Sequence, residues 1–115
     1  PAAPASAGYR SLPPRDVEAV LARENPFLLD VHVPNEGLLA GTDARIPYTD
    51  VTARAAELPA DREALIVVYC MTGRMSAIAA EELVRLGYRR VVDLDGGMVA
   101  WQAAGFPLLP ERTTP

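Results

Sequence analysis

The chain has a single cysteine, Cys70, and its position indicates nucleophilic chemistry. It follows the apolar run 65–69, which is typical of a buried strand, and precedes a stretch that is typical of a helix. A thiol at such a junction faces backbone N–H groups without intrahelical partners and the positive end of the helix dipole. Both stabilise the thiolate, which is the nucleophilic form, so the position predicts an exposed and reactive cysteine. The alternative is a free cysteine that packs as a small apolar residue.

The composition restricts the other chemistry that this chain can perform. All 11 basic residues are arginine, which leaves no lysine for a Schiff base or for a phosphate-binding loop of the Walker type. One cysteine and one histidine provide neither an internal disulfide nor a metal site, and we expect no metal and no cofactor. The net charge of −4 argues against a nucleic-acid partner, and no apolar run is long enough for a membrane span.

Helical and extended patterns alternate along the 115 residues, which suit one domain. Such alternation predicts an α/β fold with a parallel sheet and helices on both faces, and it places reactive loops at the carboxyl ends of the strands. We expect helices at 14–24, 49–58, 76–86 and 98–104, and strands at 27–31, 44–46, 65–69 and 91–94.

Both ends of the chain have compositions that do not build a core. Residues 1–8 are small, proline-rich and uncharged, and we expect a flexible leader there, a domain over residues 9–109 and a tail over residues 110–115. The chain does not begin with Met, which indicates trimming at an expression boundary or removal of a targeting segment. A periplasmic or secreted location is favoured over a cytoplasmic one.

Four segments together resemble single-domain rhodaneses, which are sulfurtransferases. They are F-L-L-D-V-H-V-P-N-E-G at 27–37, V-V-Y-C-M-T-G-R-M-S-A at 67–77, L-V-R-L-G-Y-R-R-V-V-D-L at 83–94 and D-G-G-M-V-A-W at 95–101. The resemblance implies a rhodanese-like parallel sheet of about five strands. It also implies that Cys70 carries sulfane sulfur as a persulfide, from thiosulfate or a similar donor to cyanide or a thiol, with a protein as a further kind of acceptor.

The loop after Cys70 is the implied binding site for the sulfur. Backbone N–H groups that point into such a loop form an anion-binding nest for the thiolate and for the terminal sulfur of the persulfide. Gly73 suits this loop because glycine adopts positive φ and has no side chain to fill the nest. The candidate loop residues are Met71, Thr72, Gly73, Arg74, Met75 and Ser76.

Two further residues are candidates for supporting roles. Asp30 lies near the carboxyl end of the first predicted strand, and we expect it to hydrogen-bond neighbouring loops rather than transfer a proton. His32 stands where many members of the family have arginine, and a structural role is favoured over a catalytic one. The family's H-I-P-G-A segment is absent, and the shorter G-T-D-A-R-I-P at 41–47 leaves the neighbouring loop undefined.

The residues leave two alternatives to sulfur transfer. Cysteine phosphatases of this fold have the signature C-x5-R, but the sixth residue after Cys70 is Ser76, and Arg74 comes too early to clamp a phosphate in bidentate fashion. Arg74 is instead a candidate for attracting an anionic sulfur donor, or a solvated loop charge. The other alternative is a non-catalytic sulfur carrier or protein-interaction module, although a pure interaction module would have no need of the cysteine.

Overall fold

A five-stranded parallel sheet forms the centre of the protein in the computed structural model, which describes residues 8–111. The strands are β1 (Arg10–Leu12), β2 (Phe27–Asp30), β3 (Ala44–Arg45), β4 (Leu65–Tyr69) and β5 (Arg90–Leu94). They are arranged in the order β1-β5-β4-β2-β3, and each adjacent pair is parallel. The carboxyl ends of the strands therefore meet at one edge of the sheet, as the sequence predicted.

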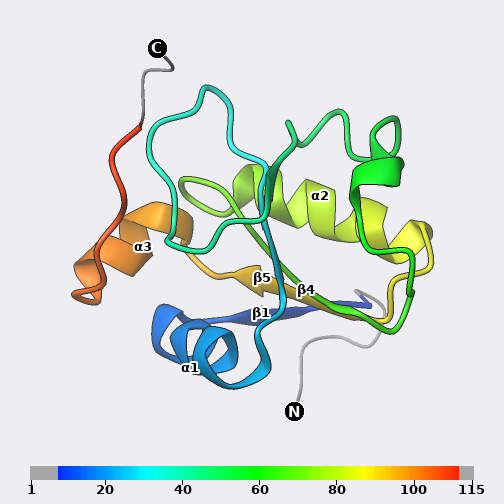
Figure 1. The fold of residues 1–115 in the computed structure, drawn as a ribbon. Helices are drawn as coiled ribbons and strands as arrows, with labels where there is room; N and C mark the ends of the chain where they lie inside the picture. Colours follow the sequence, from blue (N-terminus) through cyan, green and yellow to red (C-terminus); the bar gives the residue numbers. More distant parts are fainter. Residues whose placement is uncertain (1–7, 112–115) are drawn as a thin grey trace.

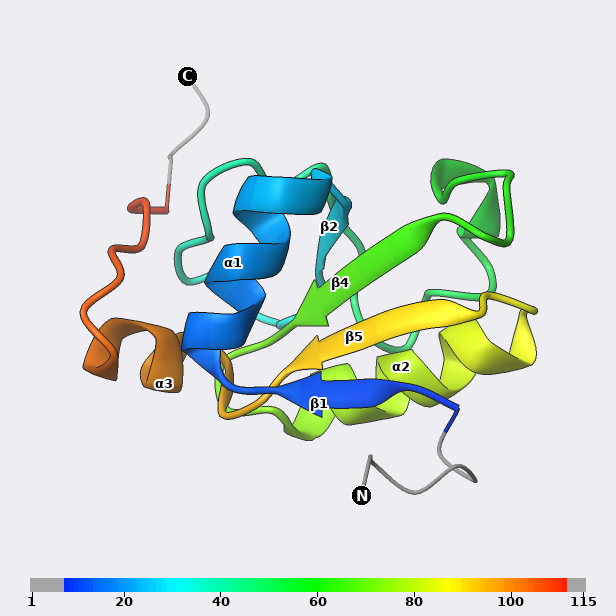
Figure 2. The same cartoon turned by 90° about the horizontal axis from the view of Figure 1, so that it is seen from below.

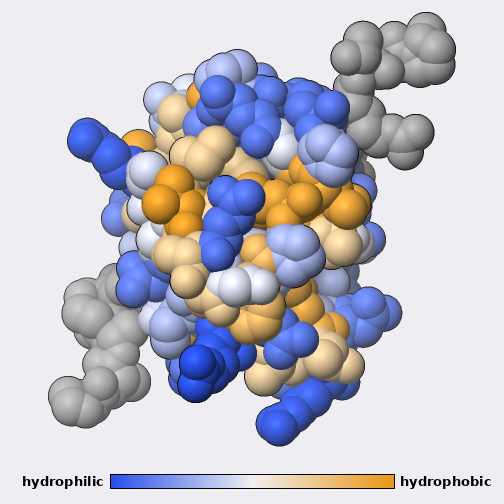
Figure 3. Space-filling model, turned by 90° about the vertical axis from the view of Figure 1, so that its left-hand side faces the viewer, coloured by the Kyte–Doolittle hydropathy of each residue, from blue (hydrophilic) through white to orange (hydrophobic). Residues whose placement is uncertain are grey.

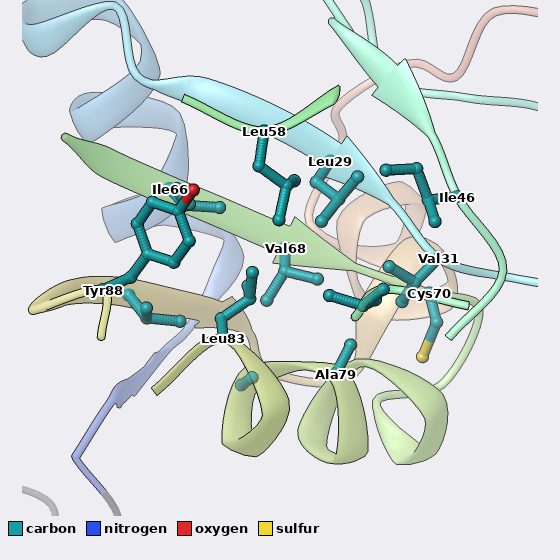
Figure 4. Packing of buried hydrophobic residues seen from close by; sticks show 13 residues of the cluster. Leu29, Val31, Ile46, Leu58, Ile66, Val68, Cys70, Ala79, Leu83 and Tyr88 are labelled. Carbon is teal, nitrogen blue, oxygen red and sulfur yellow. The ribbon is translucent and has the colours of Figure 1, made fainter. Parts of the chain in front are cut away.

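Helices cover both faces of this sheet (Figures 1 and 2). On one face lie α1 (Pro14–Glu24) and α3 (Gly97–Ala103), and on the other lies α2 (Arg74–Arg85). Side chains alternate along β4, so that Val67 packs in the cluster with α1 and α3, whereas Val68 packs in the cluster with α2. Figure 4 shows the second cluster, with Cys70 at its end beside the first turn of α2.

The strand β1 was not predicted from the sequence. It has only three residues, and Pro13 directly after it ends the extended segment and stands at the N-cap of α1. Its register, Ser11 beside Asp93 and Leu12 beside Leu94, is set by pairing with β5. Because its partner strand is more than 80 residues away, the pairing of β1 is not visible in the local hydrophobic pattern.

The prediction of a helix at 49–58 is wrong. Residues 51–54 form turns, and only Ala55–Glu57 form a short 3-10 helix. Val51, Thr49 and Thr52 are β-branched and lower the helical propensity of this stretch. Val51 and Leu58 are nevertheless buried in the cluster with α2, so the segment serves as a cover for the sheet.

The other elements agree with prediction apart from their ends. The first helix has the predicted bounds, and the strand expected at 44–46 is β3. The helix expected at 76–86 begins at Arg74, which puts Ser76 inside its first turn. This shift matters because it brings the side chain of Ser76 next to the sulfur of Cys70.

The ends predicted as leader and tail lie mostly outside the described residues, which include only Gly8, Pro110 and Glu111 of those segments. Over residues 8–111, no helix has the length and apolar character that a membrane crossing requires. Within the same range, no three His, Cys, Asp or Glu side chains come together in a way that would hold a metal ion.

The face that carries α3 and the C-terminal segment has hydrophobic surface between hydrophilic residues (Figure 3). Val99 on α3 and Leu109 in the C-terminal segment are among the exposed large apolar residues. The backbone of Leu109 pairs with that of Leu38, so the C-terminal segment is fixed against the loop that follows β2. Apolar exposure at this level is ordinary for a protein surface.

The amino end of α3 holds the loop that follows Cys70. The N–H of Met98 donates to the Cys70 carbonyl oxygen at 2.9 Å, and the N–H of Val99 donates to that of Met71 at 3.0 Å. Gly97 has φ of +60°, and a Cβ there would lie 2.5 Å from the Cys70 carbonyl oxygen. Only glycine therefore permits this contact between α3 and the loop.

The contact predicts a large cost for Gly97→Ala. We expect a loss of about 3 kcal/mol or more in the free energy of unfolding, because positive-φ strain adds to a clash with backbone atoms. Gly105→Ala is the matched control, since φ is +95° there and nothing lies within 4 Å of the added methyl group. Urea denaturation should show a loss of only about 1 kcal/mol for Gly105→Ala. Equal losses for the two variants would mean that the contact is not tight.

Candidate active site around Cys70

Cys70 directly follows β4, as predicted, but its side chain is not exposed. The residue is 1% exposed and belongs to the apolar cluster between the sheet and α2. The expectation of an exposed thiol was wrong because Cys70 packs in this cluster beside α2 (Figure 4), and its sulfur is in contact with the backbone of Gly73 and Ser76. Burial in an apolar cluster makes the local hydrogen bonds decisive for the charge state of the sulfur.

Two backbone N–H groups donate to the sulfur. Gly73 N lies 3.0 Å from Cys70 Sγ, and Ser76 N lies 3.3 Å from it. Gly73 has φ of +108°, the conformation expected from the sequence, and it turns the chain from the loop into α2. Ser76 is the third residue of α2, so its N–H has no partner within the helix and is free to bind the sulfur. The result is a small nest of donors with the helix dipole behind it.

A cavity of about 360 Å³ opens beside the sulfur. Its lining is mainly apolar, with one cationic residue, and consists of His32, Tyr48, Cys70, Met71, Thr72, Arg74, Met75 and Ile78. Six of these were candidates from the sequence. Tyr48 and Ile78 were not, because no motif marks an apolar wall that comes from separate segments.

Arg74 is the first residue of α2, and it is the cationic residue in the lining of the cavity. It is exposed, and within residues 8–111 it forms no ion pair. Its charge is thus available to an anion that enters the cavity, in an otherwise acidic protein.

Asp30 and His32 take part in hydrogen bonds between loops. Asp30 accepts from the backbone N–H of His32 at 2.9 Å and from Arg45 Nε at 3.1 Å. Burial raises the pKa of Asp30, and these hydrogen bonds together with the charge of Arg45 oppose that increase. Asp30 does not line the cavity beside Cys70, whereas His32 does, and His32 Nε2 lies 2.6 Å from Glu36 Oε1.

Arg45 extends this network to the C-terminal segment. Its Nη2 donates to Glu111 Oε1 at 2.7 Å and to the carbonyl oxygen of Gly37 at 3.2 Å. Arg45 thereby connects β3 to the loop after β2 and to the chain beyond α3. No local motif marks this arginine, because its partners come from three separate segments.

Asp93 is the second ionisable residue that the sequence did not reveal. It lies on β5, is 4% exposed, and accepts a hydrogen bond from Ser76 Oγ at 2.5 Å. Ser11 Oγ also donates to it, at 3.3 Å, and Ser76 Oγ lies 3.4 Å from Cys70 Sγ. Burial raises the pKa of Asp93 to about 6, although its bonds to Ser76 and Ser11 oppose the increase. A carboxylate within the apolar strand R-V-V-D-L was the available signal.

A second cavity, of about 340 Å³, lies away from Cys70. Leu65 and Arg90, the first residues of β4 and β5, line it, so it opens at the amino ends of the strands. The chemistry of parallel sheets is found at the carboxyl ends. The cavity beside Cys70 is therefore the candidate site.

Comparisons with known proteins agree with this geometry. A family model described as a rhodanese-like domain matches residues 14–104. The chain belongs to the rhodanese-like family. This rhodanese-like chain is 34% identical over 89 residues to a protein named sulfurtransferase from Allochromatium vinosum. The match covers 75% of this chain and 80% of the relative. It is 28% identical over 91 residues to thiosulfate sulfurtransferase GlpE of Vibrio cholerae, over 79% of this chain and 86% of that protein.

A solved structure shows the same rhodanese-like fold. A rhodanese-related protein from Thermoplasma volcanium has a TM-score of 0.76 and 31% identity, and the match covers 90% of this chain and 100% of that one. The family and the α/β fold expected from the sequence are therefore confirmed. The relatives named sulfurtransferase connect this family with sulfur transfer.

The raised pKa of Asp93 predicts a pH-dependent stability. The carboxyl group of Asp93 binds its proton more tightly in the folded protein than in the unfolded chain. The contribution of this proton to the free energy of unfolding therefore falls as the pH rises from the ordinary pKa of 3.8 to about 6. Asp93→Asn removes the dependence, and its free energy of unfolding relative to wild type should rise by about 2 kcal/mol between pH 4 and pH 7. Urea denaturation at both pH values measures this change.

The matched control for this prediction is Asp95→Asn, at an exposed position two residues away. We expect its stability relative to wild type to change much less between the two pH values. A difference between Asp93→Asn and wild type that stays constant with pH would contradict the raised pKa.

Proposed function

We propose that this protein is a sulfurtransferase that carries sulfane sulfur as a persulfide on Cys70. The observation that supports this most strongly is the pair of backbone N–H groups of Gly73 and Ser76 that donate to Cys70 Sγ. Such donors stabilise an anionic sulfur in a site from which water is largely excluded. The printed names of its relatives, sulfurtransferase and thiosulfate sulfurtransferase, add independent support.

The reaction needs only the thiolate of Cys70 and its two substrates. The thiolate attacks the outer sulfur of thiosulfate, an S–S bond forms, and sulfite leaves with the electron pair of the broken bond. Cyanide or an acceptor thiolate then attacks the terminal sulfur, and the electron pair of the cleaved S–S bond returns to Cys70 as its thiolate. Neither step requires a cofactor or a net change in protonation.

The backbone nest and the cavity have different roles in the proposed reaction. The N–H groups of Gly73 and Ser76 hold the inner sulfur, while the cavity provides space for the donor and acceptor. Arg74 attracts the anionic donor to the opening, and the apolar walls around it exclude water from the persulfide. We assign Met71, Thr72 and Met75 to the lining that shapes this space.

Ser76 also argues against a phosphatase activity at this site. It occupies the position at which the C-x5-R signature has its arginine, and its hydroxyl is engaged with Asp93. A phosphoryl group would lack the bidentate guanidinium that holds it in that class of enzyme.

The proposal predicts that Cys70 is indispensable. Wild-type protein should turn over thiosulfate and cyanide, and the mass should increase by about 32 Da, one sulfur atom, after incubation with thiosulfate alone. Cys70→Ser should show neither, because a hydroxyl group forms no persulfide. Thiocyanate production and intact-protein mass spectrometry measure the two effects.

The same experiment distinguishes the carrier alternative. A protein that gains the mass but transfers the sulfur to neither cyanide nor small thiols is a carrier for a protein acceptor. A wild-type protein that neither gains mass nor turns over would contradict sulfur chemistry altogether.

A role of Arg74 in attracting the donor predicts a change in KM. With Arg74→Gln, kcat/KM for thiosulfate should fall about three- to tenfold, mainly through KM, and its sensitivity to ionic strength should decrease. Steady-state kinetics at saturating cyanide and two salt concentrations measure this. Arg89→Gln is the control, because Arg89 is exposed, pairs with Glu63 and does not line the cavity. An equal loss in both variants would indicate an effect of net charge alone.

A further inference from the structure

Three buried side chains form a hydrogen-bonded chain that ends at the sulfur: Asp93 on β5, Ser76 on α2 and Cys70 directly after β4. Ser76 Oγ lies 2.5 Å from Asp93 Oδ1 and 3.4 Å from Cys70 Sγ. Ser76 is fully buried, and Asp93 is nearly so. Because α2 passes over the neighbouring strands β4 and β5, the serine bridges a nucleophile and a carboxyl group that solvent hardly reaches.

The hydroxyl of Ser76 has one proton and therefore serves only one acceptor at a time. With Asp93 ionised, the proton goes to the carboxylate, which matches the short distance of a charge-assisted hydrogen bond, and Cys70 donates its own proton to Ser76. With Asp93 protonated, the carboxyl group donates to Ser76, whose proton then becomes available to a thiolate. The carbonyl oxygen of Gly73, 3.3 Å from Ser76 Oγ, is a neutral and weaker competitor.

We propose that Asp93 is a positioning residue that controls the ionisation of Cys70 through the direction of the Ser76 hydrogen bond. Ionised Asp93 orients the Ser76 hydroxyl away from the sulfur and favours the thiol form of Cys70, whereas protonated Asp93 releases Ser76 to stabilise the thiolate. The consequence for sulfur transfer rests on the proposed function. The coupling itself concerns only the acid–base behaviour of this thiol.

Few other charged groups or hydrogen-bond donors surround Asp93. Asp95 at the end of β5 and Tyr9 before β1 are the ionisable groups that interact electrostatically with it, and Ser11 is its second hydrogen-bond donor. On α2, Glu81 acts on Tyr9 as well, and β4 contributes Val68 beside Asp93. No cation pairs with Asp93 in the part of the chain that the structure describes. The raised pKa of Asp93 is consistent with a carboxyl group that exchanges its proton near neutral pH.

The test measures the rate of Cys70 alkylation by iodoacetamide as a function of pH. Asn resembles protonated Asp because its amide donates to Ser76 at every pH. We therefore expect Asp93→Asn to move the midpoint of the profile down by about one pH unit, which raises the rate at pH 7 up to about tenfold. Asp95→Asn, an exposed change of the same type, should shift the midpoint much less.

Ser76→Ala distinguishes hydrogen bonding from a simple effect of charge. In that background, Asp93→Asn should no longer shift the midpoint appreciably, because the bridge is absent. An unchanged profile for Asp93→Asn, or equal shifts with and without Ser76, would overturn the proposal. Alkylation does not depend on sulfur transfer, so this failure is distinct from failure of the proposed function.

A second measurement needs no substitution at Asp93. Carbon-13 NMR of the Asp93 carboxyl group in the wild type should show a second inflection at the pH at which alkylation of Cys70 increases. The inflection should be lost in Cys70→Ser and reduced in Ser76→Ala. Its absence from the wild type would overturn the proposal even if Asp93→Asn does not fold.

Discussion

The buried sulfur of Cys70 imposes the constraint on which the rest of the site depends. An anionic sulfur is stable in an apolar cluster only where hydrogen-bond donors reach it. The chain supplies these donors from its backbone, at Gly73 and Ser76, by turning from β4 into α2 within a few residues. Positive φ at Gly73 and the free N–H in the first turn of α2 follow from that requirement. A rigid sheet beneath the loop keeps the donors in place.

A second element, α3, fixes the loop from the other side. Its first N–H groups bind the carbonyl oxygens of Cys70 and Met71, and Gly97 brings the two backbones into contact. The loop therefore has its N–H groups directed at the sulfur and its carbonyl groups bound elsewhere. A site of this kind is preorganised, because its dipoles need little rearrangement when charge develops on the sulfur.

The site combines an acidic protein with a largely apolar opening. The net charge is −4, yet the cavity beside Cys70 has Arg74 at its edge and no carboxylate among its lining residues. A buried carboxyl group, Asp93, is connected to the sulfur through Ser76. His32 lies in the lining where many rhodaneses have arginine, and it is engaged with Glu36. The positive charge of the cavity lining is therefore concentrated on Arg74.

The sequence by itself determined the strand before Cys70 and the helix after it, because these follow from the local hydrophobic pattern. A glycine at position 73 also permitted the positive φ of the turn between them. The alternation of elements also determined the parallel α/β sheet. Tertiary structure alone decided that the sulfur is buried, that β1 pairs with β5, and that Asp93 reaches Cys70 through Ser76. The physical reason is that strand order and helix packing bring together groups distant in sequence, and local propensity does not specify their register.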